Sequence, residues 1–157
     1  MIIPKRICIL GCDPGISGAI AFYFPETQER VIAEDIMVVA GHVACVSMAD
    51  RIAQLRPDIA VIEGVGAMQG WGTSSTFKFG CAYGSMLGII AAQHIPFHIV
   101  SPSVWKKYWK LDRDKEKSRA LALRLFPICA SQFARKKDHN KAEAALLARY
   151  GAETIFK

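Results

Sequence analysis

Four acidic residues stand at positions where carboxylates could act together. Asp13 follows an apolar run that ends at Gly11, and Glu63 follows the solid apolar run 59–62. Asp138 and Glu143 lie near the start of the last apolar segment. Gathered carboxylates repel one another unless a cation lies between them. Their hard oxygen atoms suit Mg²⁺, with Mn²⁺ as a substitute, and two such ions can drive phosphodiester hydrolysis.

The spacing of the last two acids restricts where they can lie. Five residues of a helix turn by ~500°, which leaves two side chains ~140° apart. Asp138 is therefore predicted to lie before a helix or at its N-cap, with Glu143 inside the helix. His139 shares a face with Glu143 and could reach the site as a metal ligand, base or proton carrier. Asn140 with Glu143 also fits a capping box, which would give Glu143 a structural role.

Each of the first two acids has a second interpretation. Asp13 stands in Asp-Pro-Gly and could be a turn residue, and Glu63 could be a solvated strand end. The segment 11–15 also resembles the first phosphate loop of sugar kinases. Those enzymes need two lobes, whereas 157 residues supply one domain.

Basic and aromatic side chains accompany the acids. The chain has 20 Lys and Arg against 14 Asp and Glu, so its net charge of +6 favours a polyanionic partner. Two clusters could hold DNA phosphates, although solvated helix faces also produce such runs. Their candidate DNA-binding members are Lys106, Lys115, Lys117, Arg135, Lys136 and Lys137. Trp71, Phe77 and Phe79 could stack on unpaired bases, whereas core packing is the default interpretation for Phe77, Phe79, Trp105 and Trp109.

The order of apolar runs predicts the elements that position these residues. Strands are expected at 6–11, 19–24, 30–39, 58–63 and 96–100, with a glycine-rich loop at 64–75. Helices are expected at 43–55, 75–94, 102–109, 116–126 and 142–150, with Gly151 as a C-terminal stop. A meander followed by alternating strands and helices predicts an α/β fold with a mixed five-stranded sheet flanked by helices. That is the layout of the ribonuclease-H-like fold, in a single domain over residues 1–157.

Composition excludes several other classes of protein. The chain is 52% hydrophobic and 22% charged, as globular proteins are. No apolar run approaches the ~20 residues of a membrane span, and no signal peptide is evident. The odd number of cysteines, five, predicts buried free thiols in a reducing compartment, and the lack of a CxxC pair argues against zinc. We expect a cytoplasmic protein of a bacterial or phage-infected cell, or an organellar one if a targeting segment precedes this sequence.

Several segments together resemble the RuvC-type Holliday-junction resolvases. These segments are 11–18 (GCDPGISG), 61–63 (VIE), 101–106 (SPSVWK) and 135–151 (RKKDHNKAEAALLARYG). The last, with 118–127, is most similar to the branch that includes plastid resolvases and bacterial or phage relatives. The resemblance implies a homodimeric, Mg²⁺-dependent endonuclease that resolves four-way DNA junctions by paired symmetric nicks during recombination or repair.

The resemblance also implies which residues do the work. The acids would be Asp13, Glu63, Asp138 and Glu143, and Lys106 and Lys115 would contact the scissile strand. In the best-known bacterial members the last two acids are three residues apart, a spacing that leads here to Asn140, an amide.

Two other functions and two uses of the long helix stay open. The chain could be a ribonuclease-H-like nuclease on RNA or hybrids, or a catalytically silent branched-DNA-binding protein. Two cuts on one junction call for a twofold dimer, with its contact expected on helix 75–94. The glycines of that helix, Gly80, Gly84 and Gly88, would permit close packing either in a dimer or against the protein's own sheet.

Overall fold

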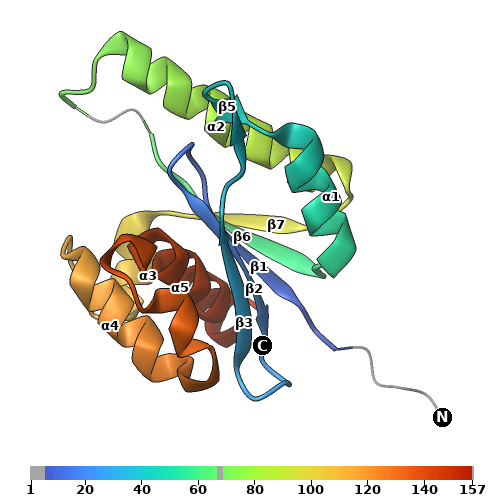
Figure 1. Cartoon of the computed structure of the whole chain (residues 1–157), viewed down its shortest axis with the longest axis vertical. Helices are drawn as coiled ribbons and strands as arrows, with labels where there is room; N and C mark the ends of the chain where they lie inside the picture. The colour runs from blue at the N-terminus through green and yellow to red at the C-terminus, as the bar shows by residue number, and fades with distance from the viewer. Residues whose placement is uncertain (1–5, 67–68, 157) are drawn as a thin grey trace.

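A mixed five-stranded sheet forms the centre of the computed structural model, which describes residues 6–66 and 69–156 (Figure 1). The strand order is β3-β2-β1-β6-β7. β1 pairs antiparallel with β2 and β2 with β3, whereas β1, β6 and β7 run parallel. The strands are β1 (Ile9–Asp13), β2 (Ala19–Phe24), β3 (Arg30–Asp35), β6 (Ile59–Glu63) and β7 (Phe97–Val100). The predicted mixed sheet is confirmed.

The third strand is shorter than predicted. It ends at Asp35, and Val38–Val39 (β4) pairs with His42–Val43 (β5) as a separate hairpin. The two residues between them, Ala40 and Gly41, both have positive φ, 49° and 78°. Two successive positive φ values turn the chain back within two residues, so the run 30–39 cannot continue as one strand.

Helices cover both faces of the sheet (Figure 1). One face carries α1 (Cys45–Leu55) and α2 (Thr73–Ala92), and the other carries α3 (Pro102–Tyr108), α4 (Lys115–Leu125) and α5 (His139–Thr154). Two 3₁₀ segments, η1 (Pro127–Phe133) and η2 (Lys136–Asp138), join α4 to α5. The sheet therefore separates two hydrophobic clusters, one for each helical layer.

Strand alternation decides which side each residue of β1 and β6 faces. Ile9 and Val61 belong to the cluster under α5, whereas Leu10 and Ile62 belong to the cluster under α1 and α2. Asp13 lies four residues after Ile9, and Glu63 lies two residues after Val61. Both acids therefore point to the α5 face, at the ends of these adjacent parallel strands.

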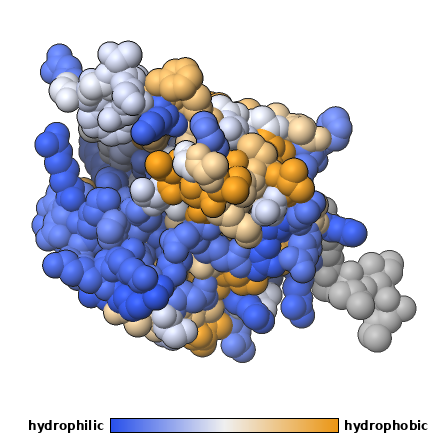
Figure 2. Space-filling view, turned by 45° about the horizontal axis from the view of Figure 1, so that its top comes forward, coloured by the Kyte–Doolittle hydropathy of each residue, from blue (hydrophilic) through white to orange (hydrophobic). Residues whose placement is uncertain are grey.

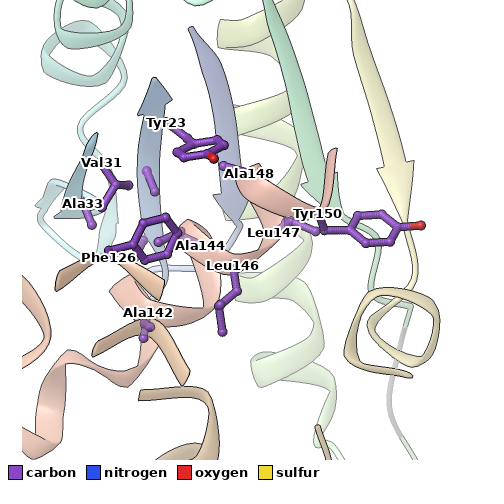
Figure 3. Close-up of a cluster of buried hydrophobic side chains, with 14 of the residues drawn as sticks. Tyr23, Val31, Ala33, Phe126, Ala142, Ala144, Leu146, Leu147, Ala148 and Tyr150 are labelled. Atoms are coloured by element: carbon purple, nitrogen blue, oxygen red, sulfur yellow. The ribbon is translucent and has the colours of Figure 1, made fainter. Parts of the chain in front are cut away.

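Helix α5 packs directly on β1 through small residues (Figure 3). Ala142, Ala144 and Ala148 are fully buried, and a Cβ added at Gly11 would lie 2.1 Å from the Ala144 carbonyl oxygen. α5 begins earlier than predicted and continues past Gly151, whose added Cβ would lie 2.4 Å from Val61 Cγ2. Gly151 is thus needed for close packing on β6, and its prediction as a helix stop was wrong.

The glycines of α2 face away from the sheet. Gly80, Gly84 and Gly88 are exposed, and no described atom lies within 4 Å of a Cβ built on them. The helix contacts the sheet through Ala82, Met86, Ile89 and Ile90 instead. The alternative that these glycines pack against the protein's own sheet was therefore wrong. Figure 2 shows an apolar patch on one face of the molecule. Val38, Val39, Val46 and Phe77 are exposed apolar residues of the layer that contains α1, α2 and the β4–β5 hairpin.

The five cysteines are all free thiols, as predicted. Cys8, Cys12 and Cys129 are buried, but Cys45 is exposed at the start of α1 and Cys81 is half-buried. In the described part of the chain, no helix has the length and apolar character needed to cross a membrane.

Two glycine-to-alanine changes test the packing of α5. Gly11→Ala is expected to lower the free energy of unfolding by about 1–3 kcal/mol or more, because its methyl group would overlap the α5 backbone. Gly84→Ala, in open space on α2, is expected to raise it by about 0.5–1 kcal/mol through helix propensity. Urea unfolding of both variants measures the difference. Equal stability of Gly11→Ala and the wild type would contradict the close approach.

Candidate active site

Three of the four predicted carboxylates line one cleft. Asp13 at the end of β1, Glu63 at the end of β6 and Glu143 in α5 share a cleft of about 680 Å³. Glu63 is 8% exposed and Glu143 is 6% exposed. The parallel register that pairs Cys12 with Ile62 sets the next residues, Asp13 and Glu63, side by side. Gly11 admits the turn of α5 that carries Glu143.

Three side-chain donors hold two of these carboxylates. The indole N–H of Trp105 donates to Glu63 Oε2 at 2.7 Å. Lys106 Nζ donates to Glu143 Oε1 at 3.0 Å, and the hydroxyl of Ser118 donates to the same oxygen at 3.1 Å. Trp105 and Ser118 are fully buried. The acids are thus oriented by α3 and α4, which lie on the same face as α5.

The surroundings of Asp13 and Glu63 disfavour the charged forms of both carboxylates. Burial, with the negative charges of Glu63 and Glu143 next in importance, raises the pKa of Asp13 to about 8. Lys115 and Lys106 oppose that rise. Burial also raises the pKa of Glu63, against the hydrogen bond from Trp105. An acidic cluster that resists ionisation in this way gains from a nearby cation.

Two lysines, Lys78 and Lys115, line the cleft, and Lys115 contacts the first turn of α5. Its Nζ lies 3.1 Å from His139 Nε2 and 3.5 Å from Asn140 Oδ1, and Asn140 donates in turn to the Ser17 carbonyl at 2.6 Å. His139 Nδ1 lies 3.1 Å from the Lys136 carbonyl, which can only accept, so Nε2 accepts from Lys115. His139 therefore meets the lysine and is not among the residues lining the cleft.

Asp138 does not join the other three acids. It lies at the N-cap position of α5, as the spacing predicted, and is 1% exposed. Its carboxylate accepts from Arg135 at 2.8 Å and pairs with Lys141 at 3.0 Å, and the Arg135 hydrogen bond holds its pKa well below the usual range. The structure therefore places Asp138 in an ion-pair network beside the cleft. Asn140, three residues before Glu143 and on the same face of α5, lines the cleft where Asp138 was expected.

The other predicted basic residues divide into two groups. Lys136 and Lys137 line a hollow of about 540 Å³ next to the cleft. Its other lining residues are Asp114, Lys115, Glu116 and His139. Arg135 and Lys117 have carboxylate partners, since Arg135 bonds to Asp138 and Lys117 to Asp112. Lys115, Lys136 and Lys137 therefore line one surface beside the cleft, whereas Lys106 is paired with Glu143.

Aromatic rings form the opposite wall of the cleft. Trp71, 40% exposed, meets Phe79 edge to face at a centroid distance of 5.5 Å, and Phe79 stacks on Tyr83 at 6.2 Å. Phe77 is 70% exposed, so its assignment to the core was wrong. The core assignment holds for Trp105 and largely for Trp109, whose indole N–H donates to the Leu146 carbonyl.

The donor set suits a hard divalent cation. Asp13, Glu63 and Glu143 offer only oxygen ligands, the preference of Mg²⁺ and Mn²⁺. Within residues 6–66 and 69–156, no three His, Cys, Asp or Glu side chains already lie close enough to enclose one ion. The acids thus share a cleft without forming a closed cage, and Asp138 and His139 are held outside it.

Three contributors were missed by the sequence analysis. Trp105 was assigned to packing alone, and Ser118 was not considered for the site. Asn140 was considered as a helix cap and as the amide at the three-residue spacing from Glu143, but not as a residue of the cleft. The i,i+3 spacing of Asn140 and Glu143 is the one signal in the sequence that indicates a shared face. Nothing local in the sequence indicates the bonds from Trp105 and Ser118, because both span long stretches of chain.

Comparison with known proteins extends the description of the fold. No family model and no curated protein matches the sequence. The structure is similar to RuvC of Thermus thermophilus in complex with a Holliday junction substrate, with a TM-score of 0.69 and 16% identity, over 94% of this chain and 96% of that one. It is also similar to the yeast mitochondrial Holliday junction resolvase Ydc2, with a TM-score of 0.57 and 17% identity, over 99% and 83%. The fowlpox virus resolvase in complex with Holliday junction DNA gives a TM-score of 0.56 and 15% identity, over 96% and 100%. The chain therefore has the ribonuclease-H-like fold of these proteins.

The stability of an Asp13→Asn variant tests the acidic cluster. Because the folded protein resists ionisation of Asp13 and the unfolded chain does not, stability falls as pH rises from about 4, the unfolded pKa, to about 8. Without divalent cations, Asp13→Asn is expected to raise Tm at pH 8 by at least about 2–4 °C, and the gain should shrink toward pH 5. Calorimetric melting across this pH range measures it.

Asp138→Asn serves as the contrasting variant. It removes a carboxylate that Arg135 and Lys141 stabilise, so its Tm is expected to fall at both pH values. A lower Tm for Asp13→Asn at pH 8 would contradict the repulsive cluster.

Proposed function

We propose that the protein is a Mg²⁺-dependent endonuclease that resolves four-way DNA junctions by paired symmetric nicks. The observation that carries this proposal is the convergence of Asp13, Glu63 and Glu143 in one cleft, beside Lys115, on a fold shared with junction resolvases. Buried carboxylates that repel each other are costly unless they have a use, and holding cations next to a phosphate is the use that fits these neighbours.

The acids and lysines in and beside the cleft have distinct roles in this proposal. Asp13, Glu63 and Glu143 would hold the divalent cation, which when bound activates water and stabilises the leaving oxygen of a phosphodiester. Lys106 keeps Glu143 oriented through their 3.0 Å ion pair. Lys115 presents its ammonium group at the cleft, where it attracts the phosphate of the strand to be cut. Asp138 orders the start of α5 through Arg135 and Lys141 and is not assigned to the cation.

DNA would lie across the basic hollow and the aromatic wall. Lys136 and Lys137 extend the positive surface from Lys115, and backbone phosphates bind such surfaces independently of sequence. Trp71 lies on the opposite wall, where an exposed ring can stack on a base that the junction leaves unpaired. The net charge of +6 supports this polyanionic partner.

A homodimer would supply two such sites. One cleft cuts one strand, and a twofold axis relates two clefts as it relates the two opposed strands of a junction. The outward-facing stripe of Gly80, Gly84 and Gly88 on α2, next to exposed Phe77, supports a contact on this helix. Sedimentation equilibrium at micromolar concentration tests the assembly.

Two finer assignments belong to the same proposal. The segment 135–151 supports a place in the branch with plastid resolvases and bacterial or phage relatives. Action on DNA of a bacterial or phage-infected cell would place the protein in the cytoplasm, where the five thiols stay reduced.

Cleavage of synthetic four-way junctions tests the proposal. With Mg²⁺, the wild type is expected to nick two opposed strands and to leave linear duplexes and RNA–DNA hybrids intact. Asp13→Asn and Glu63→Gln are expected to lower cleavage at least about 100-fold while still binding the junction, because they remove cation ligands and add no bulk. Gel assays of nicking and binding measure both effects, and Asp50→Asn, on the exposed side of α1, is the matched control for loss of one charge.

The outcomes separate the proposal from its alternatives. Preferred cleavage of RNA or hybrids would favour a ribonuclease. Tight junction binding without cleavage by the wild type would favour a silent branched-DNA-binding protein. Wild-type rates in either cleft variant would contradict the assignment of these carboxylates.

A further inference from the structure

The short helix α3 touches the acidic cleft through two consecutive residues. Trp105 is 0% exposed and donates its indole N–H to Glu63 Oε2 at 2.7 Å. The next residue, Lys106, donates to Glu143 Oε1. β6 and α5 carry the two acids, so one seven-residue helix holds carboxylates from two separate elements.

The hydrogen bond from Trp105 gives the two carboxylate oxygens of Glu63 different surroundings. Oε2 accepts from the indole, and no hydrogen-bond donor reaches Oε1 in the described ranges 6–66 and 69–156, so both lone pairs of Oε1 are available. Since Glu63 also lines the cleft, Oε1 is the oxygen left for a cation. We propose that Trp105 is a positioning residue for the metal site: its indole N–H fixes the Glu63 carboxylate in the rotation that presents Oε1 to a divalent cation.

An indole suits this task better than other donors. It donates one hydrogen bond and accepts none, so it cannot compete for the cation. It carries no charge, so it leaves the full negative charge of Glu63 for the cation, whereas a lysine at this point would neutralise it. Its ring is wholly enclosed by the cluster under α5, and that packing fixes the direction of the N–H. Groups that orient a ligand in this way raise metal affinity.

The proposal rests on the proposed function and adds a residue that this function does not require. Lys106 and Ser118 hold Glu143, so removing the indole N–H leaves their bonds intact. Loss of the Trp105 bond should therefore weaken the binding of the cation without changing the binding of DNA.

Two matched variants test the role. Trp105→Phe keeps an aromatic ring in the core and removes the N–H. Trp109→Phe, one helical turn away, removes an indole N–H bond of 3.1 Å. That bond is donated to the Leu146 carbonyl and not to an acid of the cleft. The Mg²⁺ concentration for half-maximal junction cleavage is expected to rise about 10-fold or more in Trp105→Phe and to stay unchanged in Trp109→Phe. Saturating Mg²⁺ should restore most of the cleavage rate, which a general loss of structure would not allow.

A second measurement does not depend on the variant folding or on cleavage. In the wild type, the indole N–H resonances of Trp71, Trp105 and Trp109 are followed by NMR during a Mg²⁺ titration. The Trp105 resonance is expected to shift as Glu63 engages the ion, and the Trp109 resonance to stay in place.

The outcomes distinguish this proposal from the function on which it rests. A wild type that binds Mg²⁺ with a Trp105 shift but cuts no junction would overturn the function and keep the positioning role. Cleavage by Trp105→Phe at the wild-type Mg²⁺ requirement, or Mg²⁺ binding without a Trp105 shift, would overturn the positioning role alone.

Discussion

The absence of a side chain at Gly11 lets α5 lie directly on the central strand. A single methyl group there would come within 2.1 Å of the Ala144 carbonyl oxygen, so the helix would have to move away. Glu143 precedes Ala144 and Asp13 lies two residues beyond Gly11 on the same face. The close contact of backbone with backbone therefore sets the separation of two acids in the cleft, and the buried alanines of α5 extend it along the strand.

The same packing buries the acids of the site and so determines their electrostatic surroundings. Three carboxylates meet where β1, β6 and α5 end or cross, and burial raises the pKa of Asp13 and of Glu63. The donors that surround them come from α3 and α4, so the layer that buries the acids also orients them. Asp138 shows the opposite arrangement, since Arg135 and Lys141 stabilise its charge and hold it outside the cleft.

Much of this could be predicted from local patterns in the sequence. Apolar runs ending in Asp13 and Glu63 indicated two strands with acids at their ends, and helical geometry placed Asp138 ahead of α5. Relations between distant segments could not be predicted this way. The i,i+3 spacing alone does not show that Asn140 faces the cleft, and no pattern around Trp105 shows that its N–H meets an acid 42 residues away. The glycines of α2 have the spacing of a packing stripe, but only the position of the sheet shows that they face outward.

Crystallographic location of Mn²⁺ tests the central claim, that Asp13, Glu63 and Glu143 form a cation site without Asp138. Crystals soaked in Mn²⁺ are examined by anomalous scattering at the manganese edge. Anomalous density is expected in the cleft, within bonding distance of oxygens from these three carboxylates. Density at Asp138, or an empty cleft at a Mn²⁺ concentration that supports cleavage in solution, would contradict it.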